Sequence, residues 1–206
     1  MRDVYVDFKR GFGIAASPKV GTLSIVDFFF ELHHGRKSFP GEPSHGLREL
    51  GLAHPASAAF DADVPMIAIH RDPYERIRST YQHRVVRERE APARSFRHFC
   101  ERLGYFRGYS SIAWHTDAQT HWLGARPNRY AAVLSLDELD TLPDVVARLT
   151  GQAAPAMSRS HQMRDKPDWE PGLKEMLEPW VADDLRVGWN GETSIGRTSD
   201  NNPGGS

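Results

Sequence analysis

The sequence predicts an α/β fold of three layers, in which helices flank a mainly parallel central sheet. Two observations predict it. Short apolar runs of strand length alternate along the chain with longer segments of helical periodicity, the pattern of strand–helix–strand units. Two of these runs, "FGIAA" and "VPMIAIH", also lead directly into polar segments that open helices. The chain of 206 residues, 39% hydrophobic and 26% charged, is long enough for one globular core.

Each element is predicted from its own stretch of sequence. The runs "VYVDF", "FGIAA", "VPMIAIH" and "RYAAVLSL" have strand length, and they cover residues 4–8, 12–16, 64–70 and 129–136. Apolar residues at helical spacing predict helices over residues 22–34, from 73 onwards, at about 94–103, at about 110–123, over 142–151 and over 171–188. Residues 35–60 are rich in Gly, Pro, Ser and His, so we expect mostly loop there.

Two helices carry clear boundary or packing signals. Asp72, Pro73 and Glu75 suit the N-cap, first and third positions of a helix, which is a capping-box pattern with proline at its preferred place. In the last helix an apolar face is predicted, and Pro179 is expected to kink or split the helix. The residues predicted for that face are Leu173, Met176, Leu177 and Trp180.

Bulk composition narrows the functional classes. A formal charge of −1 gives no global basic field to recruit nucleic acid, so an anionic ligand needs a local cluster of positive charge. The single cysteine, Cys100, lies on an apolar helical face and is predicted to be a core residue. No apolar run has the length of a membrane span and the N-terminus lacks a signal-peptide pattern, so we expect a cytoplasmic protein.

Two strand-to-helix corners carry the functional signal. The first corner, residues 17–24, reads "SPKVGTLS", and the second, residues 70–79, reads "HRDPYERIRS". A helix N-terminus offers unpaired N–H groups and a partial positive charge. Lys19 adds a full cation at the first corner and Arg71 adds one at the second. The two corners therefore predict two anion sites.

The first corner does not fit the common nucleotide loop. That loop needs Gly, four residues, and then Gly-Lys-Ser/Thr. Counting from Gly13 reaches Pro18, and Lys19 comes before its glycine rather than after it. The pattern therefore disfavours an ATP-hydrolysing P-loop enzyme.

Together the two motifs resemble those of the sulfotransferase superfamily, whose members use 3′-phosphoadenosine 5′-phosphosulfate (PAPS). "SPKVGTLSI" is similar to the family's 5′-phosphosulfate loop, and "IAIHRDPYERIRSTY" is similar to its 3′-phosphate motif. The branch that is most similar is the carbohydrate 2-O/4-O type. The resemblance covers most of residues 11–190 and implies a P-loop-like fold in a single domain of residues 1–190. Residues 191–206 are predicted to be a disordered polar tail.

The resemblance also implies roles for individual residues. Lys19 would stabilise the leaving group, and Arg71 with Ser79 would bind the 3′-phosphate. The predicted phosphosulfate loop consists of Pro18, Lys19, Val20, Gly21, Thr22, Leu23 and Ser24. Leu23 departs from the family pattern, which often has a hydroxyl residue there. No metal is expected.

An acceptor hydroxyl must lose a proton, so a general base is expected. By resemblance the leading candidate is His54, which stands before the second corner in "AHPASAAFDADVPMIAIHRDP". Four other candidates stay open: His33, His34, His45 and Glu42. The cationic loop 158–168 offers Arg159, Arg164 and Lys166 as further contacts to the nucleotide.

The sequence thus predicts an enzyme that transfers a sulfuryl group from PAPS to a hydroxyl of a carbohydrate or small metabolite. The expected partners are this acceptor and the donor nucleotide, without nucleic acid or a membrane span. A nucleotide kinase or phosphotransferase of P-loop ancestry, and a non-catalytic nucleotide-binding relative, remain as alternatives. The acceptor, the sulfated position and the oligomeric state are left open by the sequence.

Overall fold

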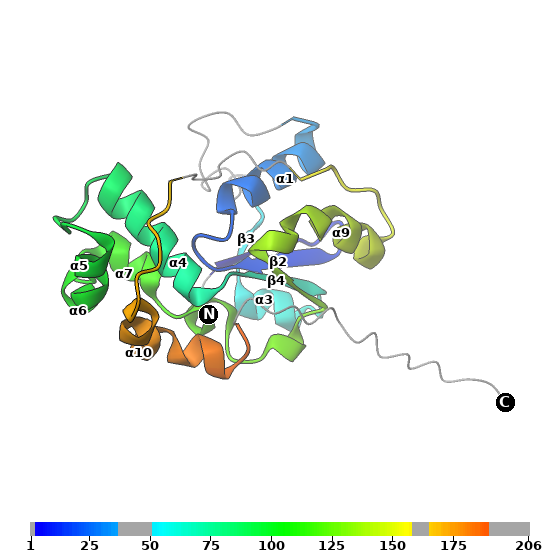
Figure 1. Ribbon diagram of the computed structural model, residues 1–206. Helices are drawn as coiled ribbons and strands as arrows, with labels where there is room; N and C mark the ends of the chain where they lie inside the picture. The colour runs from blue at the N-terminus through cyan, green and yellow to red at the C-terminus, as the bar shows by residue number, and fades with distance from the viewer. Residues whose placement is uncertain (1–2, 37–50, 158–164, 190–206) are drawn as a thin grey trace.

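A computed structural model describes residues 3–36, 51–157 and 165–189. Within them the chain forms a five-stranded sheet in the order β3-β1-β2-β4-β5. The strands are β1 (Asp3–Asp7), β2 (Phe12–Ala16), β3 (Ala53–Pro55), β4 (Met66–His70) and β5 (Ala132–Ser135). Helices lie against both faces of this sheet (Figure 1). The predicted α/β arrangement of a sheet flanked by helices is therefore present.

The sheet is parallel at its centre and antiparallel on one side. β4 pairs in parallel with both β2 and β5, whereas β1 pairs antiparallel with β2 and β3. The prediction of a mainly parallel sheet is thus correct only for β2, β4 and β5. The difference arises because a short turn joins β1 to β2, and neighbouring strands with so short a connection must run antiparallel. Residues 35–60, predicted to be mostly loop, contain β3.

The described α-helices follow the predicted order. They are α1 (Thr22–His34), α3 (Ala56–Asp61), α4 (Pro73–Thr80), α5 (Phe96–Glu101), α6 (Leu103–Phe106), α7 (Ser110–Thr116), α8 (Gln119–Leu123), α9 (Leu142–Thr150) and α10 (Leu173–Arg186). The sequence did not predict α3. The two helices expected at about 94–103 and 110–123 are each broken into two shorter ones.

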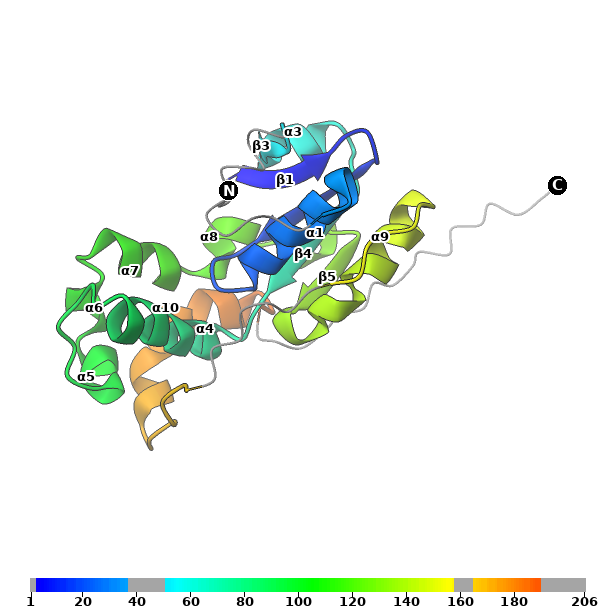
Figure 2. The same cartoon turned by 90° about the horizontal axis from the view of Figure 1, so that it is seen from above.

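Alternation along the central strands separates two of the three apolar clusters. Ile67 and Ile69 of β4 point to the face covered by α1 and α9, whereas Met66 and Ala68 point to the face covered by α3 and α8. A third cluster holds α4, α5, α6, α7 and α10 together. Figures 1 and 2 both show these five helices to one side of the sheet, so α4 leads from the end of β4 into a separate helical layer.

The helix that follows β4 changes its winding. The Asp72 carboxylate accepts from the Glu75 N–H at 2.8 Å and Pro73 is the first helical residue, as predicted. After α4 the backbone continues as a π-helix, η1 (Tyr81–Arg87), rather than as the α-helix that the periodicity predicts. The Thr80 hydroxyl, just before the switch, donates to the Arg76 carbonyl, a side-chain bond that competes with regular helix bonding. π-helical turns recur at functional sites.

Two packing predictions have different outcomes. Cys100 is buried and lies in the apolar cluster of α5, as predicted. Met176 is 40% exposed, so its placement on the buried face of α10 was wrong; Val181 and Asp184 complete that face instead. The helix runs through Pro179 without interruption.

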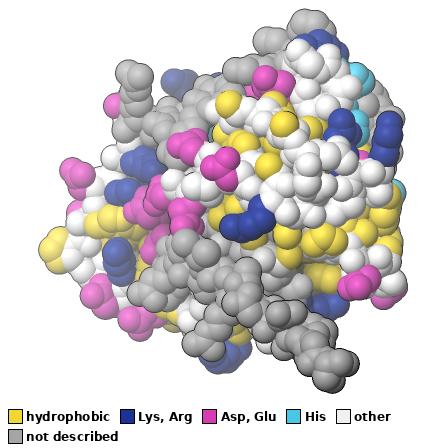
Figure 3. Space-filling model, turned by 90° about the vertical axis from the view of Figure 1, so that its right-hand side faces the viewer, with side chains coloured by type: hydrophobic (Ala, Val, Ile, Leu, Met, Phe, Trp, Pro, Cys, Tyr) yellow, Lys and Arg dark blue, Asp and Glu magenta, His cyan; other side chains and the backbone are white. Residues whose placement is uncertain are grey.

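The surface carries mixed charge. On the face drawn in Figure 3, Lys and Arg side chains are scattered among Asp, Glu and apolar side chains. None of the described helices is both long enough and apolar enough to cross a membrane. The tail predicted for residues 191–206 lies outside the described residues.

Candidate functional site

The first corner begins where β2 ends. Lys19 has a φ of 69°, a left-handed conformation that is unusual for a residue other than glycine. Gly21 has a φ of 79°, and a Cβ there would lie 3.0 Å from the Leu139 side chain, so both the backbone and the packing require glycine. The chain therefore turns sharply between β2 and α1. Pro18 and Val20 are buried and anchor this turn.

The N-terminus of α1 lacks a side-chain cap. Gly21 stands at the N-cap, makes no side-chain hydrogen bond, and no acidic residue lies in the first turn. The first N–H groups of a helix have no partners within it, so they are available to an anion. Ser24 is buried and Leu23 is 48% exposed. At α4, by contrast, Asp72 caps the helix.

The second corner brings Arg71 against the first. The Arg71 side chain is mostly buried and its Nη1 donates to the Lys19 carbonyl at 3.0 Å. Its Nη2 lies 4.0 Å from a carboxylate oxygen of Glu75. Ser79, one turn beyond Glu75, is buried on the same side of α4. The structure thus brings the cations of the two predicted motifs together.

Lys19 lies in a strongly positive environment. Burial, followed by the positive charges of Arg84 and Arg71, lowers the pKa of Lys19 to about 8. Clustered cations at a half-buried position repel one another unless an anion lies among them. The corner is therefore poised for an anionic ligand.

η1 adds residues that sequence reasoning missed. His83, Arg84 and Arg87 come from this π-helix, and Arg84 and Arg87 both contribute to the lowered pKa of Lys19. Burial, followed by the charge of Lys19, lowers the pKa of His83 to about 4, so its imidazole is neutral at pH 7. A signal was available: Ser79, His83 and Arg87 recur every fourth residue on one helix.

Arg84 is fixed between two partners. Its Nη1 lies 2.9 Å from the Glu90 carboxylate, and its Nη2 donates to Nε2 of His115 at 3.3 Å. Nδ1 of His115 lies 2.7 Å from the Ser111 carbonyl. Burial lowers the pKa of His115 to about 4, and the charges of Arg84 and Lys19 act in the same direction. The hydrogen bond to the Ser111 carbonyl acts in the opposite direction, but it is outweighed. His115 is therefore a neutral acceptor for Arg84.

Glu75 organises the cations beside Arg71. Its carboxylate accepts from Nη2 of Arg78 at 2.6 Å and from the Trp169 indole at 2.9 Å, and it lies 3.6 Å from the Lys166 ammonium. Burial alone would raise the pKa of Glu75, but the hydrogen bonds from Trp169 and Arg78 bring it below its ordinary value. Lys166, from the cationic loop, therefore lies close to the second corner. Arg159 and Arg164 lie outside the described residues.

The structure does not bring His54 to Lys19. Nε2 of His54 lies 2.7 Å from the Gly51 carbonyl, and its ring packs against Phe8, just beyond the end of β1. His54 belongs to β3 and pairs with Val4 of β1, so the whole width of β1 separates its strand from β2, which leads to Lys19. The role of His54 as the base therefore stays a prediction.

Two of the other candidate bases, His33 and His34, also lie away from Lys19. Nε2 of His33 is 3.0 Å from the Asp7 carboxylate, and His34 packs against Phe30. Both are in the last turn of α1, at the opposite end of that helix from Lys19. His45 and Glu42 lie outside the described residues.

A buried amide connects the two corners. The Gln119 carbonyl oxygen accepts from the Ser17 hydroxyl and from the Arg71 N–H, both at 2.9 Å. Its amide nitrogen donates to the Arg71 carbonyl at 2.8 Å and to the Trp189 carbonyl at 3.3 Å. Gln119 is fully buried. No local motif of the sequence marks Gln119 as part of the site.

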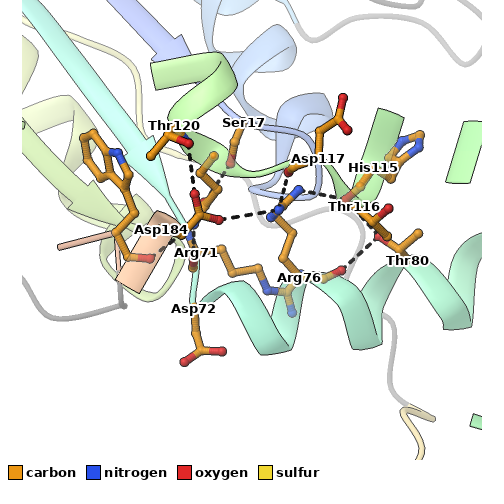
Figure 4. A network of polar contacts seen from close by, with 12 residues as sticks. Ser17, Arg71, Asp72, Arg76, Thr80, His115, Thr116, Asp117, Thr120 and Asp184 are labelled. Carbon is orange, nitrogen blue, oxygen red and sulfur yellow. Dashed lines mark hydrogen bonds and ion pairs between the residues drawn. The ribbon is translucent and has the colours of Figure 1, made fainter. Parts of the chain in front are cut away.

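The Arg76 side chain contacts other helices rather than the two corners. Figure 4 shows its side chain turned toward the residues that precede α8, and it donates to the carbonyls of His115 and Asp117. It also lies 3.6 Å from the Asp184 carboxylate, and both side chains are completely buried. Arg76 therefore connects α4 to α7 and α10. Across the described residues, no group of three metal-ligating side chains lies close enough to hold a metal ion.

Comparison with known proteins gives one likeness to report. No family model matches the chain, and no curated protein matches it. The chain is similar to a solved structure described as the crystal structure of a sulfotransferase from Alicyclobacillus acidocaldarius. The identity is 20%, the likeness covers 86% of this chain and 93% of that chain, and the TM-score is 0.48. A TM-score this low supports no inference about function, so the function is argued from the residues of the site.

Proposed function

We propose that this protein is a P-loop-like, PAPS-dependent sulfotransferase that transfers a sulfuryl group to a hydroxyl of a carbohydrate or small-metabolite acceptor. The observation that carries the proposal is the pairing of the two corners. Lys19 and Arg71 come from different strand ends, yet Arg71 bonds the Lys19 backbone at 3.0 Å. A donor with an anionic group at each end suits two adjoining cationic corners.

Each corner suits one end of the donor. The uncapped N–H groups of α1, with Lys19, Thr22 and Ser24, would hold the 5′-phosphosulfate. Arg71 and Ser79 would hold the 3′-phosphate, and Lys166 would add a cation there. Arginine suits this role because its planar guanidinium forms paired, charge-assisted hydrogen bonds.

The chemistry then requires little from the protein beyond position and charge. The acceptor oxygen attacks sulfur, the bond from sulfur to the bridging phosphate oxygen breaks, and 3′-phosphoadenosine 5′-phosphate leaves. Lys19 would stabilise the negative charge that develops on that oxygen. The acceptor proton passes to a general base. The sequence predicts His54 for this role, but His83 shares the field of Lys19 and is the base that we favour.

The first test compares nucleotides by calorimetry. We expect the protein to bind 3′-phosphoadenosine 5′-phosphate without Mg²⁺ and more tightly than ATP. Stronger binding of ATP that depends on Mg²⁺ would favour the P-loop kinase instead.

The second test measures turnover. We expect Lys19→Ala to lower transfer from labelled PAPS about 10²- to 10³-fold across an acceptor panel, as loss of one charge-stabilising group does. Lys9→Ala, a change at an exposed lysine, is the control. Nucleotide binding without any turnover would instead identify a non-catalytic relative.

A further inference from the structure

Gln119 occupies the place where the hydrogen bonding between β2 and β4 ends. The last paired residues are Ala16 and Ile69, and the next bond, from the Ser17 N–H to the Ile69 carbonyl, is already 3.4 Å long. Beyond this bond the segments that follow β2 and β4 diverge and form the two corners. At this point the Gln119 side chain forms hydrogen bonds to both segments, with Ser17 after β2 and with Arg71 after β4.

The four contacts use the full hydrogen-bonding capacity of the side chain. The amide oxygen accepts two bonds and the amide nitrogen donates two. A glutamate cannot donate, and an asparagine is one methylene shorter. Because the group is completely buried, water cannot replace a lost partner.

The bonds reach the backbone on both sides of the site. Arg71 is held at both its N–H and its carbonyl, which fixes the backbone from which its side chain extends toward Lys19. Ser17 stands two residues before Lys19, at the start of the sharp turn. A shift at Gln119 would therefore change the distance between the two cations.

We propose that Gln119 is a positioning residue that sets the separation of the two corners, so that one nucleotide can engage both at once. This proposal rests on the proposed function. The proposal predicts that Gln119 contributes little to the binding of a ligand with one phosphate. It should contribute much more to the binding of a ligand with two phosphates. When one phosphate is bound, the second binds at an effective concentration that depends on geometry.

The test measures three ligands by calorimetry: adenosine 5′-monophosphate, adenosine 3′-monophosphate and 3′-phosphoadenosine 5′-phosphate. In Gln119→Met we expect the affinity for the bisphosphate to fall about tenfold or more, and the two monophosphates to change by less than about threefold. Gln152→Met, at an exposed position, is the matched control and should change none of them. Thermal unfolding with and without each ligand gives an independent readout.

A milder variant keeps the test decisive if Gln119→Met does not fold. Ser17→Ala removes one hydroxyl and leaves every backbone bond in place, so the bisphosphate should lose about threefold in affinity while the affinities of the two monophosphates stay unchanged. An equal loss for all three ligands, or no loss for any, would overturn the positioning role while leaving the proposed function intact. If the unaltered protein binds the bisphosphate no better than the monophosphates, the proposed function fails, and this role with it.

Discussion

At the scale of single residues, the main feature is a lysine whose charge depends on what it binds. Burial, followed by positive neighbours, lowers the pKa of Lys19 to about 8 in the free protein. A bound phosphosulfate would reverse the sign of the nearest charge and raise that pKa. The same argument applies to His83, whose pKa is lowered to about 4 by burial and then by Lys19.

The first prediction is therefore proton uptake on binding. Near pH 8 about half of the free molecules have a neutral Lys19, and the bound state restores the proton. Affinity for 3′-phosphoadenosine 5′-phosphate should thus fall as pH rises above about 8, and stay nearly constant just below it. Calorimetry at pH 8 in two buffers of different ionisation enthalpy measures the uptake. Lys19→Met should remove it; uptake that persists in this variant would assign it to another group.

The second prediction concerns the base. His83 is neutral at pH 7, shares the field of Lys19, and gains basicity when an anion binds, whereas His54 packs against Phe8. We therefore expect His83→Ala to lower kcat by about 10²-fold, the usual size of a general-base effect, and His54→Ala to lower it far less. Turnover of both variants at saturating donor, followed against pH, measures this. The opposite ranking would return the role to His54.

The sequence could identify Lys19 and Arg71 because each belongs to a compact local motif. It could not identify Arg84 or His115 in the same way. Arg84 reaches the site through the winding of η1, and His115 joins it from a distant helix. Contacts of that kind depend on tertiary packing, which no local spacing records.

At the scale of elements, the two corners differ in how their helices begin. α4 starts with the Asp72 cap, and α1 starts with Gly21 and no side-chain cap. The cap on α4 occupies the Glu75 N–H and places a carboxylate at that end, so the uncapped N-terminus of α1 is the better anion site of the two. The sequence predicted both helix starts, because proline and glycine mark them. It did not predict β3 or the π-helix, whose local sequences carry no such markers.

The third prediction tests the cap. Asp72→Ala should lower the free energy of unfolding by about 1 kcal/mol, because the Glu75 N–H loses its acceptor. Urea unfolding measures this. Asp61→Ala, at the exposed C-terminal end of α3, serves as the control and should change it by less than about 0.5 kcal/mol. Equal effects of the two changes would contradict the capping role.

At the scale of the whole molecule, one buried ion pair ties the helical layer together. Arg76 of α4 and Asp184 of α10 are both completely buried, and burial raises the pKa of Asp184. Figure 4 shows that their network continues to Asp117, between α7 and α8, and to Thr120 of α8, whose N–H donates to the Asp184 carboxylate at 3.0 Å. The sequence placed Arg76 near the second corner. It could not show that the side chain turns away from that corner, because its partner lies in a distant helix.

The fourth prediction follows from that pair. Arg76→Met leaves the Asp184 carboxylate buried without its partner and should cost about 3–5 kcal/mol of the free energy of unfolding. The matched control is Arg186→Met, which breaks an exposed pair with Asp183 in the same helix and should cost less than about 1 kcal/mol. Denaturant unfolding compares them. If Arg76→Met costs no more than Arg186→Met, the pair does not hold the helices together.

The most direct test of the central claim assigns each end of the donor to its corner. It measures the affinities of adenosine 5′-monophosphate and adenosine 3′-monophosphate in Lys19→Ala and in Arg71→Ala. The 5′-monophosphate should lose affinity mainly in Lys19→Ala and the 3′-monophosphate mainly in Arg71→Ala, each by about tenfold, while the bisphosphate weakens in both. Equal losses of both monophosphates in either variant, or no loss in either, would contradict the account.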